Sequence, residues 1–232
     1  MLRILFGEPP REDQGETKQA LDAIDRYLEK VRSHMSKDGD PHHDWRKIEV
    51  WTVGLRTSLD ELEQSLYACR RYAERVDKVY EQDMSEAEQD DYYRHVFFYK
   101  DGFIRVFSVL DKLGTLLNEV LHLGTERVKN RYSFFTVLRQ MRARGVTPEL
   151  TNRLIDLKDS HKDTLQRLRK KRNTEIHHMN TELQDDLWQL HRSLNEKLKL
   201  ENINSNVHDL DEAYITVCHV MTAVFERLIT VR

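Results

Sequence analysis

Apolar residues recur every three or four positions along most of the chain, a spacing that places them on one face of an α-helix. Comparable stripes occupy residues 21–31, 51–73, 150–168 and 210–228. The clearest stripe is formed by Phe103, Val106, Phe107, Leu110, Leu113, Leu117, Val120 and Leu121. We therefore predict an all-α protein.

Polar and turn-forming residues divide these stripes into separate helices. Asp44 is an expected N-cap, Ser85 with Glu88 fits a capping box, and Thr147-Pro148-Glu149 favours a helix start. Gly124 is expected to end the longest helix. The connections are short, so we predict one bundle of long antiparallel helices, with a short basic helix inserted before the helix that starts at Pro148. The predicted helices cover residues 16–36, 45–82, 86–123, 132–142, 148–177, 182–198 and 208–229.

The length of 232 residues suits a single domain, and only 8 glycines and 4 prolines interrupt it. Residues 1–15 are predicted to form a flexible N-terminal arm, and residues 16–232 one helical bundle. Cys69 and Cys218 are expected to be buried, reduced thiols. No stretch approaches the roughly 18 apolar residues that span a bilayer, so we expect a cytoplasmic protein without a membrane partner.

The formal net charge is −3, but basic residues cluster locally. Six basic residues and no acid lie between Arg127 and Arg144, and five of the six residues from Arg167 to Arg172 are basic. Such patches attract polyanions, although a charge run is also typical of a solvated helix face. Tyr132, Phe134 and Phe135 lie among the first group, which is compatible with stacking on RNA, although burial of the two phenylalanines is favoured.

One basic residue, Arg172, falls on the apolar side of the helix predicted over 148–177. At about 100° per residue, Leu150 and Leu168 share that side with His161 and Arg172. A buried arginine must pair with an acid, reach solvent past the helix end, or line a cleft. His161 is expected to be a hydrogen-bonded core histidine.

The residues from Arg172 to His177 match the Arg-x4-6-His motif, with a polar residue directly after the arginine. The chain therefore resembles the HEPN superfamily (higher eukaryotes and prokaryotes nucleotide-binding domains), in its stand-alone bacterial branch, from about residue 45 to the end. The resemblance implies a metal-independent endoribonuclease that uses no cofactor and forms a homodimer with two motifs in one cleft. It also implies a role in stress or phage defence, with a protein antitoxin or regulator as a further partner.

The same resemblance implies a role for each motif residue. His177, with His178 as the alternate, acts as general base or acid at the ribose 2'-hydroxyl, and the product carries a 2',3'-cyclic phosphate. Arg172 binds the scissile phosphate, and Asn173 orients the histidine or the phosphate. Met179 stands where toxin-type members have a tyrosine, so regulation through that tyrosine is not expected. From the two basic clusters, we expect RNA contacts at Arg131, Arg139, Arg142, Arg169, Lys170 and Lys171.

The motif carries a geometric condition. Positions five apart on a straight helix differ by about 140°, so Arg172 and His177 do not share a face. They form one site only if the helix ends between them or if a second subunit completes the site.

Two other functions stay open at this point. One is a non-catalytic HEPN module that binds RNA, a nucleotide or a protein partner. The other is a metal-binding bundle, because Glu175-x-x-His178 and Glu119-x-x-His122 resemble the ligand pairs of di-iron carboxylate proteins. Glu119 lies almost opposite the apolar stripe of its helix, so this function ranks last.

Overall fold

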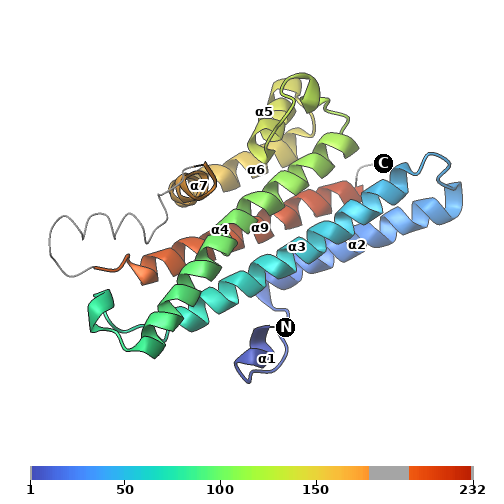
Figure 1. Cartoon of the computed structure of the whole chain (residues 1–232). Coiled ribbons are helices and arrows are strands. Elements are labelled where there is room, and N and C mark those ends of the chain that lie inside the picture. Colours follow the sequence, from blue (N-terminus) through green and yellow to red (C-terminus); the bar gives the residue numbers. More distant parts are fainter. Residues whose placement is uncertain (1, 178–198, 231–232) are drawn as a thin grey trace.

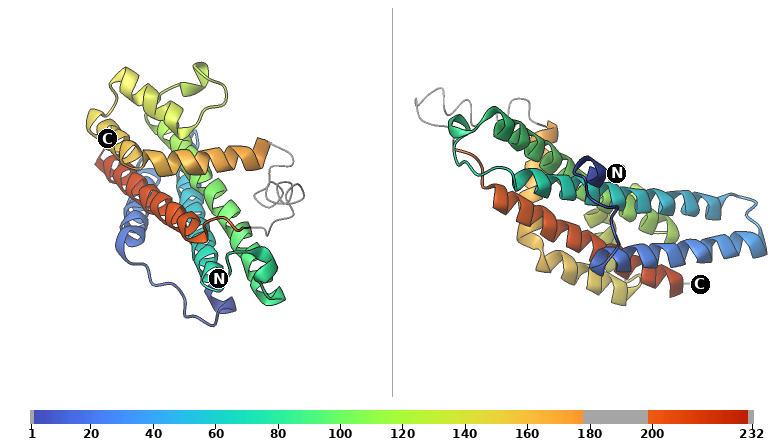
Figure 2. Two further views of the ribbon diagram at one scale, coloured as in Figure 1. Left: turned by 90° about the vertical axis from the view of Figure 1, so that its left-hand side faces the viewer. Right: turned by 90° about the horizontal axis from the view of Figure 1, so that it is seen from below.

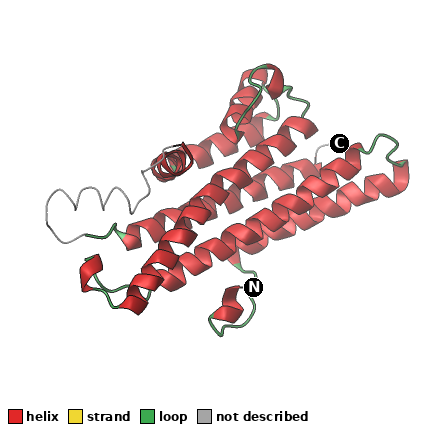
Figure 3. Cartoon of the chain, viewed as in Figure 1, coloured by secondary structure: helices red, strands yellow, loops and turns green. Residues whose placement is uncertain are grey.

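The structure, a computed structural model, describes residues 2–177 and 199–230 (Figure 1). Within these ranges it contains eight α-helices and two short 3-10 helices, and the sole strand-like pairing is an isolated bridge between Tyr80 and Lys199 (Figure 3). The predicted all-α fold is confirmed. The helix predicted over 182–198 lies outside the described residues.

Four long helices form the body of the bundle. Consecutive helices α2, α3 and α4 run in alternate directions, and α9 contacts all three of them (Figure 1). This confirms the predicted bundle of long antiparallel helices. Their bounds are α2 (Gly15–Asp38), α3 (Asp44–Ala73), α4 (Glu86–Val120) and α9 (Ile203–Thr230).

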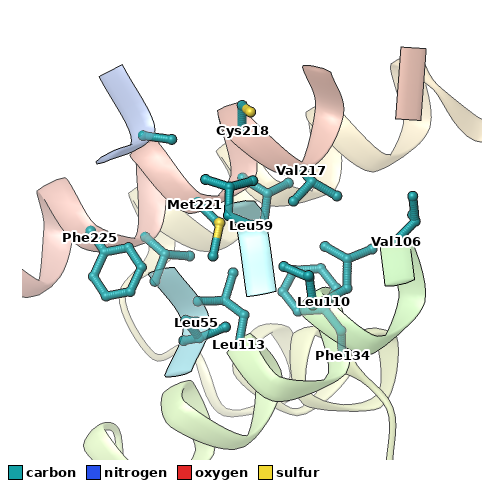
Figure 4. Close-up of a cluster of buried hydrophobic side chains, with 14 of the residues drawn as sticks. Leu55, Leu59, Val106, Leu110, Leu113, Phe134, Val217, Cys218, Met221 and Phe225 are labelled. Atoms are coloured by element: carbon teal, nitrogen blue, oxygen red, sulfur yellow. The ribbon is translucent and has the colours of Figure 1, made fainter. Parts of the chain in front are cut away.

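Side chains from α3, α4 and α9 meet in one continuous apolar core (Figure 4). Burial of each large apolar side chain contributes about 1.5–3 kcal/mol relative to exposure, so this core sets the position of α4 against α9. The two helices then form the platform on which α7 lies. The central residues, each at most 2 % exposed, are Leu55, Leu59, Leu110, Leu113, Met221 and Phe225.

By length and composition alone, α9 is long and apolar enough to span a membrane. We had expected no such segment in this chain. Of its most apolar window, 67 % is buried inside the protein. Core helices of soluble proteins pass the same test, and this burial is what such a helix shows.

The start of α5 (Phe134–Arg144) is fixed against α4 by two features. A Cβ atom at Gly114 would lie 2.9 Å from the Cα atom of Phe134, so the helices approach this closely because residue 114 is glycine. The Phe134 N–H donates to Asp111 Oδ1 at 2.9 Å, which satisfies one of the free donors at the helix start. The short basic helix therefore has a defined place on α4.

The segment 148–177 forms two helices where we predicted one, so that prediction was wrong at His161. α6 (Pro148–Ser160) ends there, because His161 has φ −113° and ψ 25°, and α7 (Lys162–His177) runs on in another direction. Figure 2 shows α7 crossing over α4 and α9. The helical wheel assumed a straight helix, whereas a tertiary contact holds this bend: His161 Nδ1 lies 2.8 Å from Glu212 Oε1 on α9.

The boundaries of α3 differ from those predicted. The helix ends at Ala73, nine residues before the predicted end. Its start is capped by Asp40 and not by Asp44: the carboxylate of Asp40 accepts the N–H groups of Trp45 at 3.2 Å and Arg46 at 2.8 Å. The capping residue is therefore drawn from the preceding loop, four residues before the helix begins.

The start of α4 follows the prediction in part. Ser85 Oγ accepts the N–H of Glu88 at 3.2 Å, as an N-cap does. The carboxylate of Glu88, however, accepts the N–H groups of Asp77 and Lys78 at 2.8 Å each, so no reciprocal capping box forms. The helix ends at Val120, three residues before the predicted end.

Residues 2–14, for which we expected a flexible arm, lie against α3 and include the short helix α1 (Leu2–Leu5). Arg3 and Arg11 both donate to the carboxylate of Glu63, at 3.1 Å and 2.9 Å. The ring of Phe6 packs edge-on against Tyr67, with 5.7 Å between centroids. These contacts locate the segment, and the division into an arm and a bundle stays a prediction.

Candidate functional site

α7, which carries the motif, is fastened to α9 by charged contacts. Arg167 donates to both oxygens of Asp209, at 2.9 Å and 2.6 Å, and the Asp209 side chain is buried. Such a two-point contact restricts the rotation of a helix more than a single hydrogen bond does. Thr164 and His161 both bind the carboxylate of Glu212, and these hydrogen bonds lower the pKa of Glu212.

Arg172 faces the inside of the bundle, as the wheel indicated. Its guanidinium carbon lies 5.2 Å from the centre of the Phe107 ring on α4, and that ring is 3 % exposed. This distance fits a cation–π contact. Nε of Arg172 is buried and has no hydrogen-bond partner among the described residues. The planar guanidinium is therefore positioned by an aromatic ring and not by an acid among the described residues.

The nearby carboxyl of Asp111 on α4 feels two positive charges from α7. Burial raises the pKa of Asp111, the N–H of Phe134 lowers it, and the charges of Arg172 and Arg169 lower it further. No ion pair between Asp111 and either arginine is present within the described part of the chain. Asp111 therefore interacts with the charge of Arg172 without forming an ion pair with it.

The structure does not show the helix break that would let Arg172 and His177 share a face. α7 is continuous to His177, so the two positions differ by about 140° around its axis. Asn173 is half-buried and makes no hydrogen bond with the residues described here. The side chain of His177, and His178 as a whole, lie outside the described residues. Of the two conditions from sequence, only completion by a second subunit is left.

Lys171, one of the expected RNA contacts, has partners within the chain. Its Nζ lies 3.0 Å from both Glu201 Oε2 and Asn206 Oδ1, and 5.0 Å from the centre of the Tyr99 ring. These contacts tie α7 to the segment that leads into α9. Lys170, its neighbour, is exposed.

The structure brings three of the expected RNA contacts together in one pocket. Arg139, Arg142 and Arg169 line a cavity of about 450 Å³ between α5, α6 and α7, whereas Arg131 is exposed and does not line it. Three further cations line the same cavity and were missed from sequence: Lys129, Lys158 and Lys162. The sequence did not identify these lysines for two reasons. Each lies in a charge run typical of a solvated helix face, and the bend at His161 that brings the helices together was not predicted. We call this cavity the basic pocket.

The metal-binding alternative finds no assembled ligand set. Glu119 is ion-paired with Lys47, and His122 follows the end of α4 with a φ of 49°. Glu175 pairs with Lys100 at 3.1 Å. Within residues 2–177 and 199–230, no three His, Cys, Asp or Glu side chains lie close enough together to hold a metal ion.

Comparison with known proteins places the chain in a family. The family model described as HEPN_Cthe2314-like HEPN matches residues 51–228, which is more than half of the chain. The match covers the motif and the basic pocket alike. Searches of curated proteins and of solved structures gave no match.

Proposed function

Because the chain belongs to the HEPN_Cthe2314-like HEPN family, as its motif predicted, we propose that it is a metal-independent endoribonuclease that works as a homodimer. The observation that carries the proposal is the inward-facing Arg172, a guanidinium seated on Phe107 with no acid partner in the described part of the chain. An arginine so placed is suited to bind the phosphate whose bond is broken.

The proposed reaction is an attack of the ribose 2'-oxygen on the adjacent phosphorus. His177, or His178 as the alternate, takes the 2'-hydroxyl proton, and the new P–O bond forms as the bond to the 5'-oxygen breaks. The leaving oxygen takes a proton from water, which leaves a 2',3'-cyclic phosphate. Arg172 stabilises the charge that grows on the phosphate oxygens, and Asn173 orients the histidine or the phosphate.

The dimer supplies what one α7 helix does not. With about 140° between Arg172 and His177, the arginine of one subunit and the histidine of the other meet only across an interface. HEPN domains commonly form dimers, which supports this arrangement. The remaining proposals from the resemblance are a cytoplasmic bacterial setting, a role in stress or phage defence, and a protein antitoxin or regulator.

The test is cleavage of single-stranded RNA by the purified protein in the presence of EDTA. We expect cleavage by the wild type and its loss in His177→Ala and in Arg172→Ala, with 2',3'-cyclic phosphate ends on the products. Arg26→Ala, which removes an exposed cation from the outer face of α2, is the matched control and is expected to retain activity. Absence of cleavage with every RNA tested, or full activity of His177→Ala and His178→Ala, contradicts the proposal.

A second function has one observation in its favour. The basic pocket collects cations independently of His177, so a HEPN module that has lost catalysis still binds RNA, a nucleotide or an acidic protein partner through it. RNA binding without cleavage in the same assay identifies this function.

A further inference from the structure

The basic pocket holds more positive charge than the chain compensates. Six cations line it and one acid, Asp159, lies among them. In the described residues, the single ion pair of this set joins Lys158 to Asp159 at 2.8 Å. The other five cations make no ion pair there: Lys129, Arg139, Arg142, Lys162 and Arg169. Besides the hydrogen bond from Lys158, the charges of Lys162 and Arg142 also act on Asp159 and help to lower its pKa.

Several cations elsewhere in the bundle are paired with acids. Arg167 binds Asp209, and Arg105 binds both Asp101 and Glu61, at 2.6 Å and 2.5 Å. Like charges in one concave site repel one another, and the repulsion is relieved when an anion with several charges enters. The basic pocket is such a concave site, because it gathers five cations that make no ion pair with the described residues.

The basic pocket adjoins the motif along α7. Arg169 lines the pocket and precedes Arg172 by three residues, about 4.5 Å along the helix axis. The charges of both arginines act on the same carboxyl, that of Asp111. An anion that is bound at Arg172 and continues as a chain of phosphates reaches the pocket within one helical turn.

The basic pocket is lined by apolar side chains as well as by cations. Phe135 from α5 is half-buried and lines the cavity together with Leu138, Ile155 and Leu165. A flat lipid surface does not fit into a cavity of about 450 Å³. A nucleotide does, because its phosphate meets the cations while its base stacks on an aromatic ring.

We propose that the basic pocket binds the single-stranded RNA segment next to the scissile phosphate, with Arg139, Arg142 and Arg169 on its phosphates and Phe135 against a base. This inference rests on the proposed ribonuclease function, since it gives the substrate a path away from Arg172. It adds Lys129, Lys158 and Lys162 to the expected contacts and leaves out Arg131, Lys170 and Lys171.

The experiment measures binding of 2'-O-methyl RNA, a probe that lacks the attacking 2'-hydroxyl and is not cut. The full-length Arg139→Glu/Arg142→Glu variant is compared with Arg26→Glu/Lys37→Glu, which changes the net charge equally on exposed α2. We expect at least about a tenfold loss of affinity in the pocket variant and little change in the control. Loss of two phosphate contacts also makes the negative slope of log K against log salt concentration shallower by about 1.4.

Arg139→Gln/Arg142→Gln covers the case in which the two glutamates disturb folding, and circular dichroism checks each variant. Equal losses in the pocket and control variants overturn the inference, as does a wild type that does not bind the probe. Failure of the proposed function is seen separately: wild-type protein then binds 2'-O-methyl RNA in the pocket but cuts no ordinary RNA. If the wild type cleaves RNA and both pocket variants bind the probe as tightly as the wild type, the proposed RNA-binding role of the pocket is wrong while the ribonuclease function stands.

Discussion

The guanidinium of Arg172 lies 5.2 Å from the centre of the buried Phe107 ring, and Nε of this arginine has no partner among the described residues. An arginine that only held the fold together would be expected to pair with an acid, as Arg167 does with Asp209. The contact with Phe107 positions the charge and leaves its hydrogen-bond donors unused. Arg172 and Arg167 therefore differ in their contacts on the same helix, and this difference supports the proposed role of Arg172.

Arg172→Met tests that distinction, because methionine keeps an apolar contact with Phe107 and removes the charge. We expect the free energy of unfolding to change by no more than about 1 kcal/mol, since no buried ion pair is broken. RNA cleavage is expected to fall by roughly 10²–10³-fold, the usual cost of losing one donor to a developing oxyanion. Urea unfolding and a cleavage time course measure the two effects. A large loss of stability with a small loss of activity would assign Arg172 to the fold.

The bend at His161 makes stability depend on acid pH through Glu212. Hydrogen bonds from Thr164 and His161 lower the pKa of this carboxyl below its ordinary value of 4.5. Because the folded pKa is the lower one, the contribution is complete above about pH 5 and is lost as pH falls through the folded pKa. We expect the difference in unfolding free energy between wild type and Glu212→Gln to narrow as pH falls from about 5 to about 3, approximately the window of carboxyl titration. Denaturant unfolding at each pH measures this difference. A difference that does not vary with pH contradicts the stabilising role of the Glu212 carboxylate.

Gly114→Ala is expected to destabilise the attachment of α5. The new Cβ would meet the backbone of Phe134 at 2.9 Å, and overpacking of this kind costs about 1–3 kcal/mol. Gly54→Ala on α3 is the matched control, because nothing lies within 4 Å of its Cβ, and we expect it to stabilise the helix by about 0.5–1 kcal/mol. Urea unfolding gives both values. Since Arg139 and Arg142 lie on α5, affinity for 2'-O-methyl RNA falls in Gly114→Ala alone; equal behaviour of the two variants contradicts the close approach.

The sequence predicted well what depends on local periodicity. The stripe from Phe103 to Leu121 identified the core helix α4, and the Arg172-to-His177 motif identified the family before any comparison. Contacts between distant segments were the ones it missed. The bend at His161 depends on Glu212, fifty-one residues further along the chain, and a wheel carries no information about that contact.

The basic pocket shows the same limit. Lys158 and Lys162 lie on either side of the bend, and Lys129 lies in the loop before α5. As single positions each is typical of a solvated surface. They become one site only once α5 is seated on Gly114 and the chain bends at His161.

Mixed dimers test the central claim, a site shared between two subunits, most directly. Arg172→Ala and His177→Ala are purified separately, mixed in equal amounts through a cycle of dissociation and reassociation, and assayed for RNA cleavage in EDTA. If the arginine of one subunit acts with the histidine of the other, random pairing restores about a quarter of wild-type activity, because half of the dimers hold one intact site of two. A mixture as inactive as each variant alone, with active wild-type protein carried through the same cycle, contradicts the claim.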